Sequence, residues 1–513
     1  MAKTEERNDL QGRKVLTAVM PKKLTAETVG EILNKVIPIH KKNSKDIAYL
    51  DEYKRGNQPI LYREKEVRPD IKNIVVENRA FEFVAFKLGY EFSHPLQYTN
   101  IGANKSAPVG ILNTYAHLDS KATKDIELAE WMYTCGTSYR VCLINKHATV
   151  DDAPYLTDVL DPRYTFVVYS TEIGKKPILA GRYVSKTIIK DGKEEEVIVY
   201  AIYTQSYIYT WEMAEGEGNF IEKKPASEEN RHLMIPIIEY PLNKSRLGYV
   251  ELCIHLFNAI NNIGSNRIDG IEQFIQSLLV FINCELPNAL DKEGKQLLDP
   301  AGNPIKTVPK SGGAIDVKSN SPGLPADVKY LVSQLNQNDA QITKEDLLNA
   351  AYEIAGVPSR ADRRSGGDTG QAVILRDGWG AAEARAKSTE KLFRKSEYEY
   401  LRIVLHLCRN IQSAAAEIGG LTLRDVGITF QRTRSDNMLV KAQTFNMLLD
   451  AGVDYELACE ISELFHDPAS AAEKSKKWQN ENVEWLNRRY RMVRKIPGNE
   501  TPADETEETI IEE

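Results

Sequence analysis

Residues 248–282, GYVELCIHLFNAINNIGSNRIDGIEQFIQSLLVFI, have apolar members that recur at helical spacing, which predicts one long helix. The stretch 326–354, ADVKYLVSQLNQNDAQITKEDLLNAAYEI, has the same period and follows a glycine- and proline-rich insert. At about 1.5 Å per residue, each helix would be roughly 40–50 Å long. Two such rods joined by an insert predict a stalk rather than an enzyme pocket.

The loop after the second rod, residues 356–370, reads GVPSRADRRSGGDTG. It gathers positive charge and backbone freedom at one end of the stalk. Its glycine cluster is similar to a phosphate-cradling loop, but it follows a helix rather than a strand, which weakens that interpretation. The candidate site residues of this loop are Arg360, Asp362, Arg363, Arg364, Ser365, Gly366, Gly367 and Asp368.

The composition is ordinary for a soluble protein of several domains. The 513 residues are enough for two to four domains, and the net charge is −7. This acidic balance argues against tight nucleic-acid binding over the whole surface. The six cysteines form no C-x-x-C pair, so reduced, buried thiols are expected. No signal peptide is recognised, and no apolar run approaches the roughly 20 residues that cross a bilayer.

Outside the stalk, periodicity predicts an α+β fold that is mainly helical. Residues 25–53 form a helical pattern that Pro38 should break or kink. Between 139 and 240 the period shifts towards two, which predicts an antiparallel, meander-like sheet. We recognise no internal repeat. The other expected elements are a mobile arm (1–22), helices at 72–88, 369–413, 435–451, 454–465 and 467–495, a strand at 428–430, and a disordered acidic tail (497–513).

The motifs of common enzymes are absent from the sequence. No G-x-x-x-x-G-K-[ST], H-E-x-x-H or G-x-S-x-G occurs, and the histidines do not cluster at metal-ligand spacing. The acidic pair Asp151-Asp152 and the run 194–196 allow a metal-dependent nuclease, but solvated turns explain them better. We therefore expect no catalytic residue, no metal and no cofactor.

Short motifs in a fixed order carry a family resemblance. They are YKRGNQ (53–58), NIVVEN (73–78), KLGYEFSHPL (87–96), GTSY (136–139), DPRY (161–164), IPIIEY (235–240), SG (365–366) with GQA (370–372), and FQR (430–432) followed by DN (436–437). Around the helix–insert–helix–loop–helix core, they resemble bacteriophage portal proteins of the SPP1 type. Two departures are Ser93 in place of a glycine and the missing proline after Arg432.

The resemblance implies a set of domains. They are a wing (23–240) completed by a long helix and strand (372–432), a stem of two helices (241–283 and 326–355), a clip hairpin (284–325), a tunnel loop (356–371) and a helical crown (433–496).

The resemblance also implies a function and partners. Family members form a homo-oligomeric ring, typically of twelve subunits, at one vertex of the capsid in the virion. Double-stranded DNA passes through the ring, driven by a separate terminase. The expected partners are the terminase large subunit, the head-completion or adaptor protein, and the major capsid and scaffolding proteins. No membrane is involved, and synthesis is expected in the host bacterial cytoplasm.

Two sites follow from this resemblance, each with a plainer alternative. The arginines of the tunnel loop would touch DNA phosphates transiently, or would simply pair with neighbouring carboxylates in a solvated loop. The clip would dock partners through mixed charges, or would carry those charges for solubility. The clip residues are Asp291, Lys292, Glu293, Lys295, Lys306 and Lys310.

The first rod is apolar on more than one stripe, because Leu252, Leu256 and Ile260 lie off the row from Val250 to Phe257. One face would pack within the subunit and another on a neighbour in the ring, or both would belong to one wide intramolecular core. Two other functions remain open: a connector subunit without a DNA channel, and a metal-dependent DNA-processing enzyme.

Overall fold

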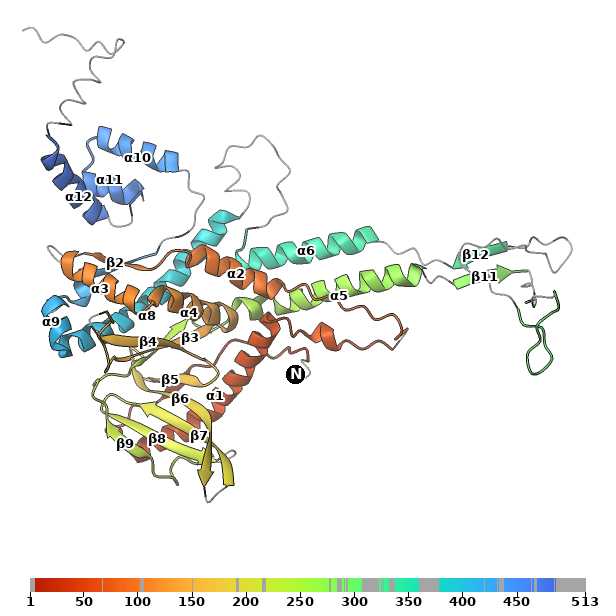
Figure 1. Ribbon diagram of the computed structural model, residues 1–513, viewed down its shortest axis with the longest axis horizontal. Helices are drawn as coiled ribbons and strands as arrows, with labels where there is room; N and C mark the ends of the chain where they lie inside the picture. Colours follow the sequence, from red (N-terminus) through yellow and green to blue (C-terminus); the bar gives the residue numbers. More distant parts are fainter. Residues whose placement is uncertain are drawn as a thin grey trace, which may run out of the picture.

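The computed structural model describes most of the chain, and its elements form a broad body from which a long helix pair extends (Figure 1). The described residues are 5–66, 68–101, 106–149, 151–190, 193–214, 218–275, 278–283, 288–289, 291, 294–306, 323, 325, 327–331, 337–358, 378–418, 420–430, 432, 438–462, 464–465, 468–483 and 485. Across these ranges, no helix is both long and apolar enough to span a bilayer.

The larger sheet confirms the predicted meander. In the described residues its strand order is β1-β5-β6-β7-β8-β9, and every pairing is antiparallel except that of β1 with β5. Helix α1 packs on this sheet, where Val29 and Leu33 meet Phe166 and Trp211. The strands are β1 (Leu16–Ala18), β5 (Thr165–Ser170), β6 (Pro177–Lys190), β7 (Lys193–Tyr203), β8 (Tyr207–Ala214) and β9 (Ala226–Glu229).

Helix α1 (Ala26–Lys54) runs through Pro38, so of the two expected effects, a break or a kink, the break does not occur. Thr25 caps the helix in a capping box with Thr28. Val36 and Ile37, next to the proline, are buried against the sheet. Burial of this apolar face offsets the hydrogen bond that a helical proline removes.

The main core lies between the helices of the body and two smaller sheets, ordered β10-β3-β4 and β13-β2. Helices α4 and α8 lie close to β3, so the body is layered helix on sheet. Its elements are η1 (Pro59–Tyr62), α2 (Arg79–Glu91), β2 (Gln97–Asn100), α3 (Ser106–Leu118), α4 (Lys121–Cys135), β3 (Thr137–Ile144), β4 (Tyr155–Leu160), β10 (Ile237–Pro241), α8 (Trp379–Asn410), α9 (Gln412–Ile418), η2 (Leu423–Asp425) and β13 (Val426–Thr429).

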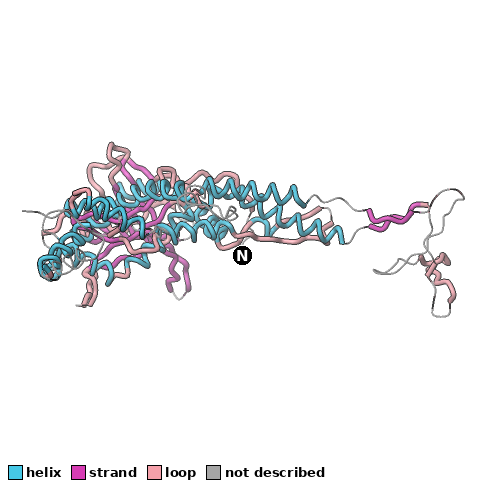
Figure 2. Tube along the Cα trace, turned by 90° about the horizontal axis from the view of Figure 1, so that it is seen from above, coloured by secondary structure: helices cyan, strands magenta, loops and turns pink. Residues whose placement is uncertain are grey.

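The helix pair is α5 (Tyr249–Ile275) and α6 (Gln337–Ala355), which lie side by side in both views (Figures 1 and 2). The prediction of helix to residue 282 and from residue 326 is wrong at both distal ends. There β11 (Leu278–Ile282) and β12 (Asp327–Leu331) pair antiparallel, with Val280 opposite Lys329. The run LLVFI has no polar residue, and periodicity cannot distinguish helix from strand in such a run.

An extended segment, residues 73–77, lies along α5, so the predicted helix 72–88 begins only at Arg79. Polar side chains of α5 at every fourth position accept alternate backbone N–H groups of this segment. The bonds are Glu77 N to Asn261 Oδ1 (2.8 Å), Val75 N to Ser265 Oγ (3.0 Å) and Asn73 N to Asp269 Oδ1 (2.7 Å). The rise of four residues along α5 is therefore close to the length of two residues of extended chain. These side chains of α5 hold the segment in the extended conformation.

The described part of the N-terminal segment, from residue 5 onward, is not the mobile arm that its polarity predicts. Gly12 has φ +77° and packs on the backbone of Ser245. Arg13 is buried and donates to both oxygens of Glu251 on α5 at 2.9 Å. The chain then enters the larger sheet as β1. Burial of the ion pair at a glycine turn fixes this segment, and composition alone does not reveal such contacts.

The predicted C-terminal helices are present as a separate group at the end of the molecule opposite β11 and β12 (Figure 1). They are α10 (Met438–Asp450), α11 (Tyr455–Ser462) and α12 (Pro468–Glu481). The expected continuation to residue 495 and the acidic tail lie outside the described residues. The long helix predicted over 369–413 is described from Trp379 and ends at Asn410.

Candidate functional site

The two ends of the predicted basic loop meet at the base of the helix pair. All eight candidate residues, Arg360 to Asp368, lie outside the described residues, but both flanks are described. A Cβ on Gly378, at the start of α8, would lie 3.8 Å from the Cα of Pro358. The two described flanks of residues 359–377 therefore lie side by side.

Two cations from other elements cap the C-terminal end of α6. Arg385 of α8 donates to the carbonyl oxygens of Glu353 (3.0 Å) and Ile354. Lys87 of α2 donates to the carbonyl oxygen of Gly356 over 3.1 Å. The last carbonyls of a helix lack intrahelical partners and carry partial negative charge, so cations are favourable there. The loop entry is thereby tied to α2 and α8.

Lys87 is completely buried at this cap. Burial lowers the pKa of its ammonium to about 8, while nearby Glu91 raises it and Arg385 lowers it further. The ring of Tyr249 faces the ammonium at 4.9 Å. Burial also raises the pKa of Glu91, whose carboxylate accepts from the Tyr133 hydroxyl at 2.7 Å. Lys87 thus anchors the loop from inside the body.

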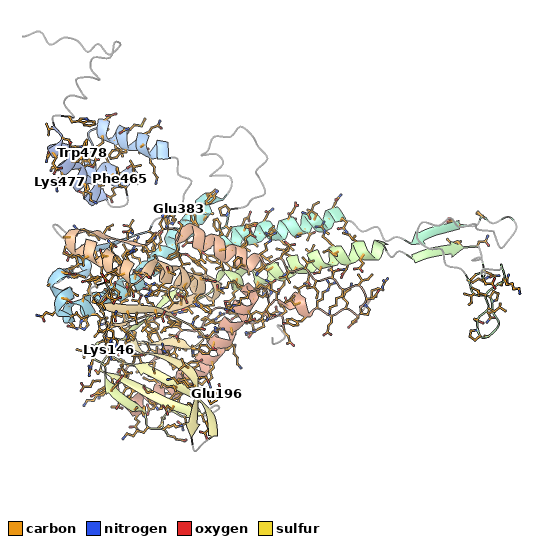
Figure 3. The ribbon with its side chains drawn as sticks, viewed as in Figure 1. Lys146, Glu196, Glu383, Phe465, Lys477 and Trp478 are labelled. Carbon is orange, nitrogen blue, oxygen red and sulfur yellow. The ribbon has the colours of Figure 1, made fainter. Side chains whose placement is uncertain are left out.

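The loop exit is held by the first turns of α8, where Figure 3 labels Glu383. Tyr90 of α2 donates to Glu383 Oε2 at 2.7 Å, and Trp379 packs against the Tyr90 ring at 5.7 Å. Arg432, on the chain that leads to α10, pairs with Glu383 Oε1 at 2.5 Å and with Glu390. Loop entry, loop exit and the connection to the C-terminal helices therefore meet around the end of α2.

A buried charge network fixes the middle of α8. Glu397 is fully buried and pairs with Lys121 at 2.8 Å and with Arg140 at 3.4 Å. Asp125 completes the network by pairing with both cations. Burial alone would raise the pKa of Glu397, but Lys121 and Arg140 outweigh it and hold this pKa below its usual value. The network fastens α8 to α4 and β3.

The distal insert contains a repeat that we did not recognise in the sequence. Ala289, Leu297 and Ile305 are eight residues apart, and each donates its backbone N–H to the carbonyl of another, closing a triangle of 2.7–2.8 Å bonds. Each intervening turn has the pattern D-x-x-G, with positive φ at Gly294 and Gly302. The spacing of Asp291-x-x-Gly294 and Asp299-x-x-Gly302 was the available signal.

This triangle holds the described part of the insert around residues 294–306. Of the predicted clip residues, Asp291, Lys295 and Lys306 are described, whereas Lys292, Glu293 and Lys310 lie outside the described residues. Asp291 accepts the Lys295 N–H at 2.9 Å, so its carboxylate is used within the turn. Three apolar side chains are exposed beside these charges, at 42%, 56% and 44% of their area: Leu297, Leu298 and Ile305.

Asp152 and Glu196, from the two acidic runs noted in the sequence, accept local hydrogen bonds. Asp152 caps an exposed turn by accepting from Thr149 at 2.7 and 3.0 Å. Glu196 accepts from Ser185 across the β6–β7 pair at 2.6 Å. Within the described ranges, no group of three His, Cys, Asp or Glu side chains is placed to hold a metal. The five described cysteines are buried and unpaired.

Comparison with known proteins decides the family. The family model described as phage portal protein, SPP1 Gp6-like, matches residues 33–484. The chain belongs to this family. As a portal protein it is a structural component of the phage particle, in a family that is structural rather than enzymatic. A search of curated proteins gave no significant match.

Two solved structures were also compared with this portal protein. One is a chain of "Neck of empty GTA particle computed with C6 symmetry", with 10% sequence identity and a TM-score of 0.36 over 76% of this chain and 91% of the other. The other belongs to "Virion of native gene transfer agent (GTA) particle", with 10% identity and a TM-score of 0.35 over 75% and 89% of the two chains.

Proposed function

We propose that this portal protein forms a homo-oligomeric ring of twelve subunits at one vertex of the capsid. Double-stranded DNA passes through its axial channel during packaging and ejection. The observation that carries the proposal is the closed, cation-capped base from which the basic segment departs, at the body end of the helix pair. A channel loop needs such a base because a moving duplex exerts force on it.

The charge distribution suits a conduit better than a DNA-binding protein. A protein that neutralises about 6–10 phosphates binds DNA largely through these charges, and its affinity for DNA falls by roughly 10³–10⁵ between low and moderate salt. Binding of that strength would stop the duplex from moving through a channel. This chain is acidic overall and places Arg360, Arg363 and Arg364 in one short segment. In a ring each arginine becomes a circle of charge, offset by Asp362 and Asp368.

The distal insert supports a docking role at the other end of the helix pair. Its exposed leucines and isoleucine lie beside Lys295 and Lys306 on a backbone fixed by the hydrogen-bond triangle. A rigid, partly apolar surface favours protein partners. The proposed partners there are the terminase large subunit during packaging and the head-completion or adaptor protein afterwards. The major capsid and scaffolding proteins would contact the body.

The double substitution Arg363→Ala with Arg364→Ala tests the channel role. We expect rings of unchanged size and a changed amount or rate of DNA packaged. Arg402→Ala is the matched control, because Arg402 is an exposed arginine on α8 that pairs with Glu399. Loss of ring formation in the double variant would show that these arginines are structural and would contradict the channel assignment.

A further inference from the structure

Arg432 occupies a position that links separate parts of the molecule. It lies on the chain between β13 and α10, and its side chain is 9% exposed. Its guanidinium reaches two carboxylates of α8, Glu383 at 2.5 Å and Glu390. These glutamates are seven residues apart, so they share one helix face. A planar guanidinium is suited to bridging two carboxylates, and a lysine ammonium is not.

The contacts continue from Arg432 to the end of α6. Glu383 accepts from Tyr90 at 2.7 Å, and Tyr90 is one helical turn from Lys87 on α2. Lys87 then donates to Gly356 at the loop entry. Around Glu383, α8 also contributes Lys387, whose ammonium lies 3.5 Å away and whose side chain is 58% exposed. The path thus joins the chain after β13 to three helices, α8, α2 and α6, through side chains that are mostly buried.

We propose that Arg432 is a positioning residue that couples the chain after β13 to both described flanks of the basic segment, Gly356 and the first turns of α8. It holds Glu383 against Tyr90, so the first turns of α8 and the last turn of α6 keep one arrangement on α2. Displacement of the chain before α10 would release both anchors together. These contacts lie within one subunit, so the coupling is separate from the passage of DNA.

Hydrogen exchange on the full-length protein tests the coupling. The informative amides are Ala382 at the loop exit and Gly356 and Val357 at the loop entry, whose N–H groups bond to Gly378, Glu353 and Tyr352. We expect Arg432→Ala to speed exchange at both ends by roughly tenfold, because a lost charged hydrogen bond has about that effect on local opening. Arg432→Lys should give an intermediate increase. Arg402→Ala, the exposed control on α8, should change exchange at neither end.

A second variant separates coupling from a local effect. Tyr90→Phe removes only the hydroxyl that contacts Glu383, and in this background Arg432→Ala should affect Gly356 and Val357 less. The remaining effect would pass through Arg385, which binds the α6 carbonyls directly from α8. Unchanged exchange at the loop entry in Arg432→Ala would overturn the proposal, as would equal effects in both backgrounds. If Arg432→Ala fails to fold, Glu390→Gln takes its place, because it removes one of the two ion pairs of Arg432. Exchange should then rise at both the loop entry and the loop exit, by at least half of the factor expected for Arg432→Ala.

Discussion

Lys87 Nζ donates to the carbonyl oxygen of Gly356 over 3.1 Å, joining the middle of the body to the point where the basic segment begins. A buried lysine is costly, because its charge is removed from water. Here the ammonium gains a helix C-terminus and the Tyr249 ring as partners. The family motif KLGYEF at 87–92 therefore acts as a structural junction: its lysine holds the loop entry and its tyrosine holds the loop exit.

The pKa of Lys87 predicts a specific pH dependence. Its native pKa of about 8 lies below the value of 10.5 in the unfolded chain, so the unfolded state binds more protons between these values. Stability from this group must therefore rise with pH, by on the order of 1.4 kcal/mol per unit above pH 8. We expect the difference in melting temperature between the native protein and Lys87→Met to grow in favour of the native protein from pH 8 to 10. A difference that stays constant would contradict the assignment.

Gly356 should tolerate no side chain. Its φ of +60° is unfavourable for other residues, and an added Cβ would lie 2.3 Å from Cδ of Arg385. Gly356→Ala would displace that arginine from the α6 carbonyls, so we expect about 2–4 kcal/mol of destabilisation. Gly380→Ala is the control, because Gly380 lies in α8 with open space around it and should stabilise by about 0.5–1 kcal/mol. Chemical unfolding measures both, and equal effects would disprove the packing argument.

The extended segment along α5 depends on Asp269. This buried carboxylate accepts from Asn73 N at 2.7 Å and pairs with Lys65 at 2.8 Å. Asp269→Ala should cost roughly 3 kcal/mol locally, since buried partners lose their acceptor. Hydrogen exchange at residues 73–77 should rise markedly. Asp70→Ala, which removes an exposed partner of Arg68, should leave these amides unchanged, and a similar rise in both variants would be evidence against the ladder.

The network around Glu397 should be the most sensitive to substitution. Glu397→Ala leaves Arg140 and Lys121 without one of their two buried carboxylates, and such losses cost about 3–5 kcal/mol. Glu399→Ala, two residues along α8, removes only an exposed pair with Arg402 and should change stability by less than about 0.5 kcal/mol. Thermal unfolding of the two variants provides the comparison. A small effect of Glu397→Ala would mean that the network adds little to holding α8.

Elements were predictable where apolar residues recur at a helical period or where a short run is rich in β-branched and aromatic residues. Helices α1, α5 and α6 and the β5–β8 meander have these patterns, and their existence was predicted correctly. The errors lie where partners distant in sequence decide the structure. Residues 278–282 are strand because 327–331 pair with them, and 73–77 are extended because α5 presents acceptors at every fourth position.

The candidate site was predictable only in part. The position of the basic segment at the end of α6 came from sequence order, but its anchors Lys87, Arg385 and Arg432 did not. Each acts on a residue at least 31 positions away, and no local pattern encodes such a contact. The octapeptide spacing of Ala289, Leu297 and Ile305 was visible in the sequence, yet its meaning depends on backbone bonds that only the fold shows.

The proposed DNA channel can be tested by electron microscopy of the purified protein and of the particle vertex. We expect closed rings of twelve subunits, with an axial hole wide enough for a B-form duplex and with the β11–β12 ends of the subunits gathered at one end. Rings whose hole is too narrow for a duplex, or a vertex that lacks this protein as a ring, would contradict the proposed role as a DNA channel.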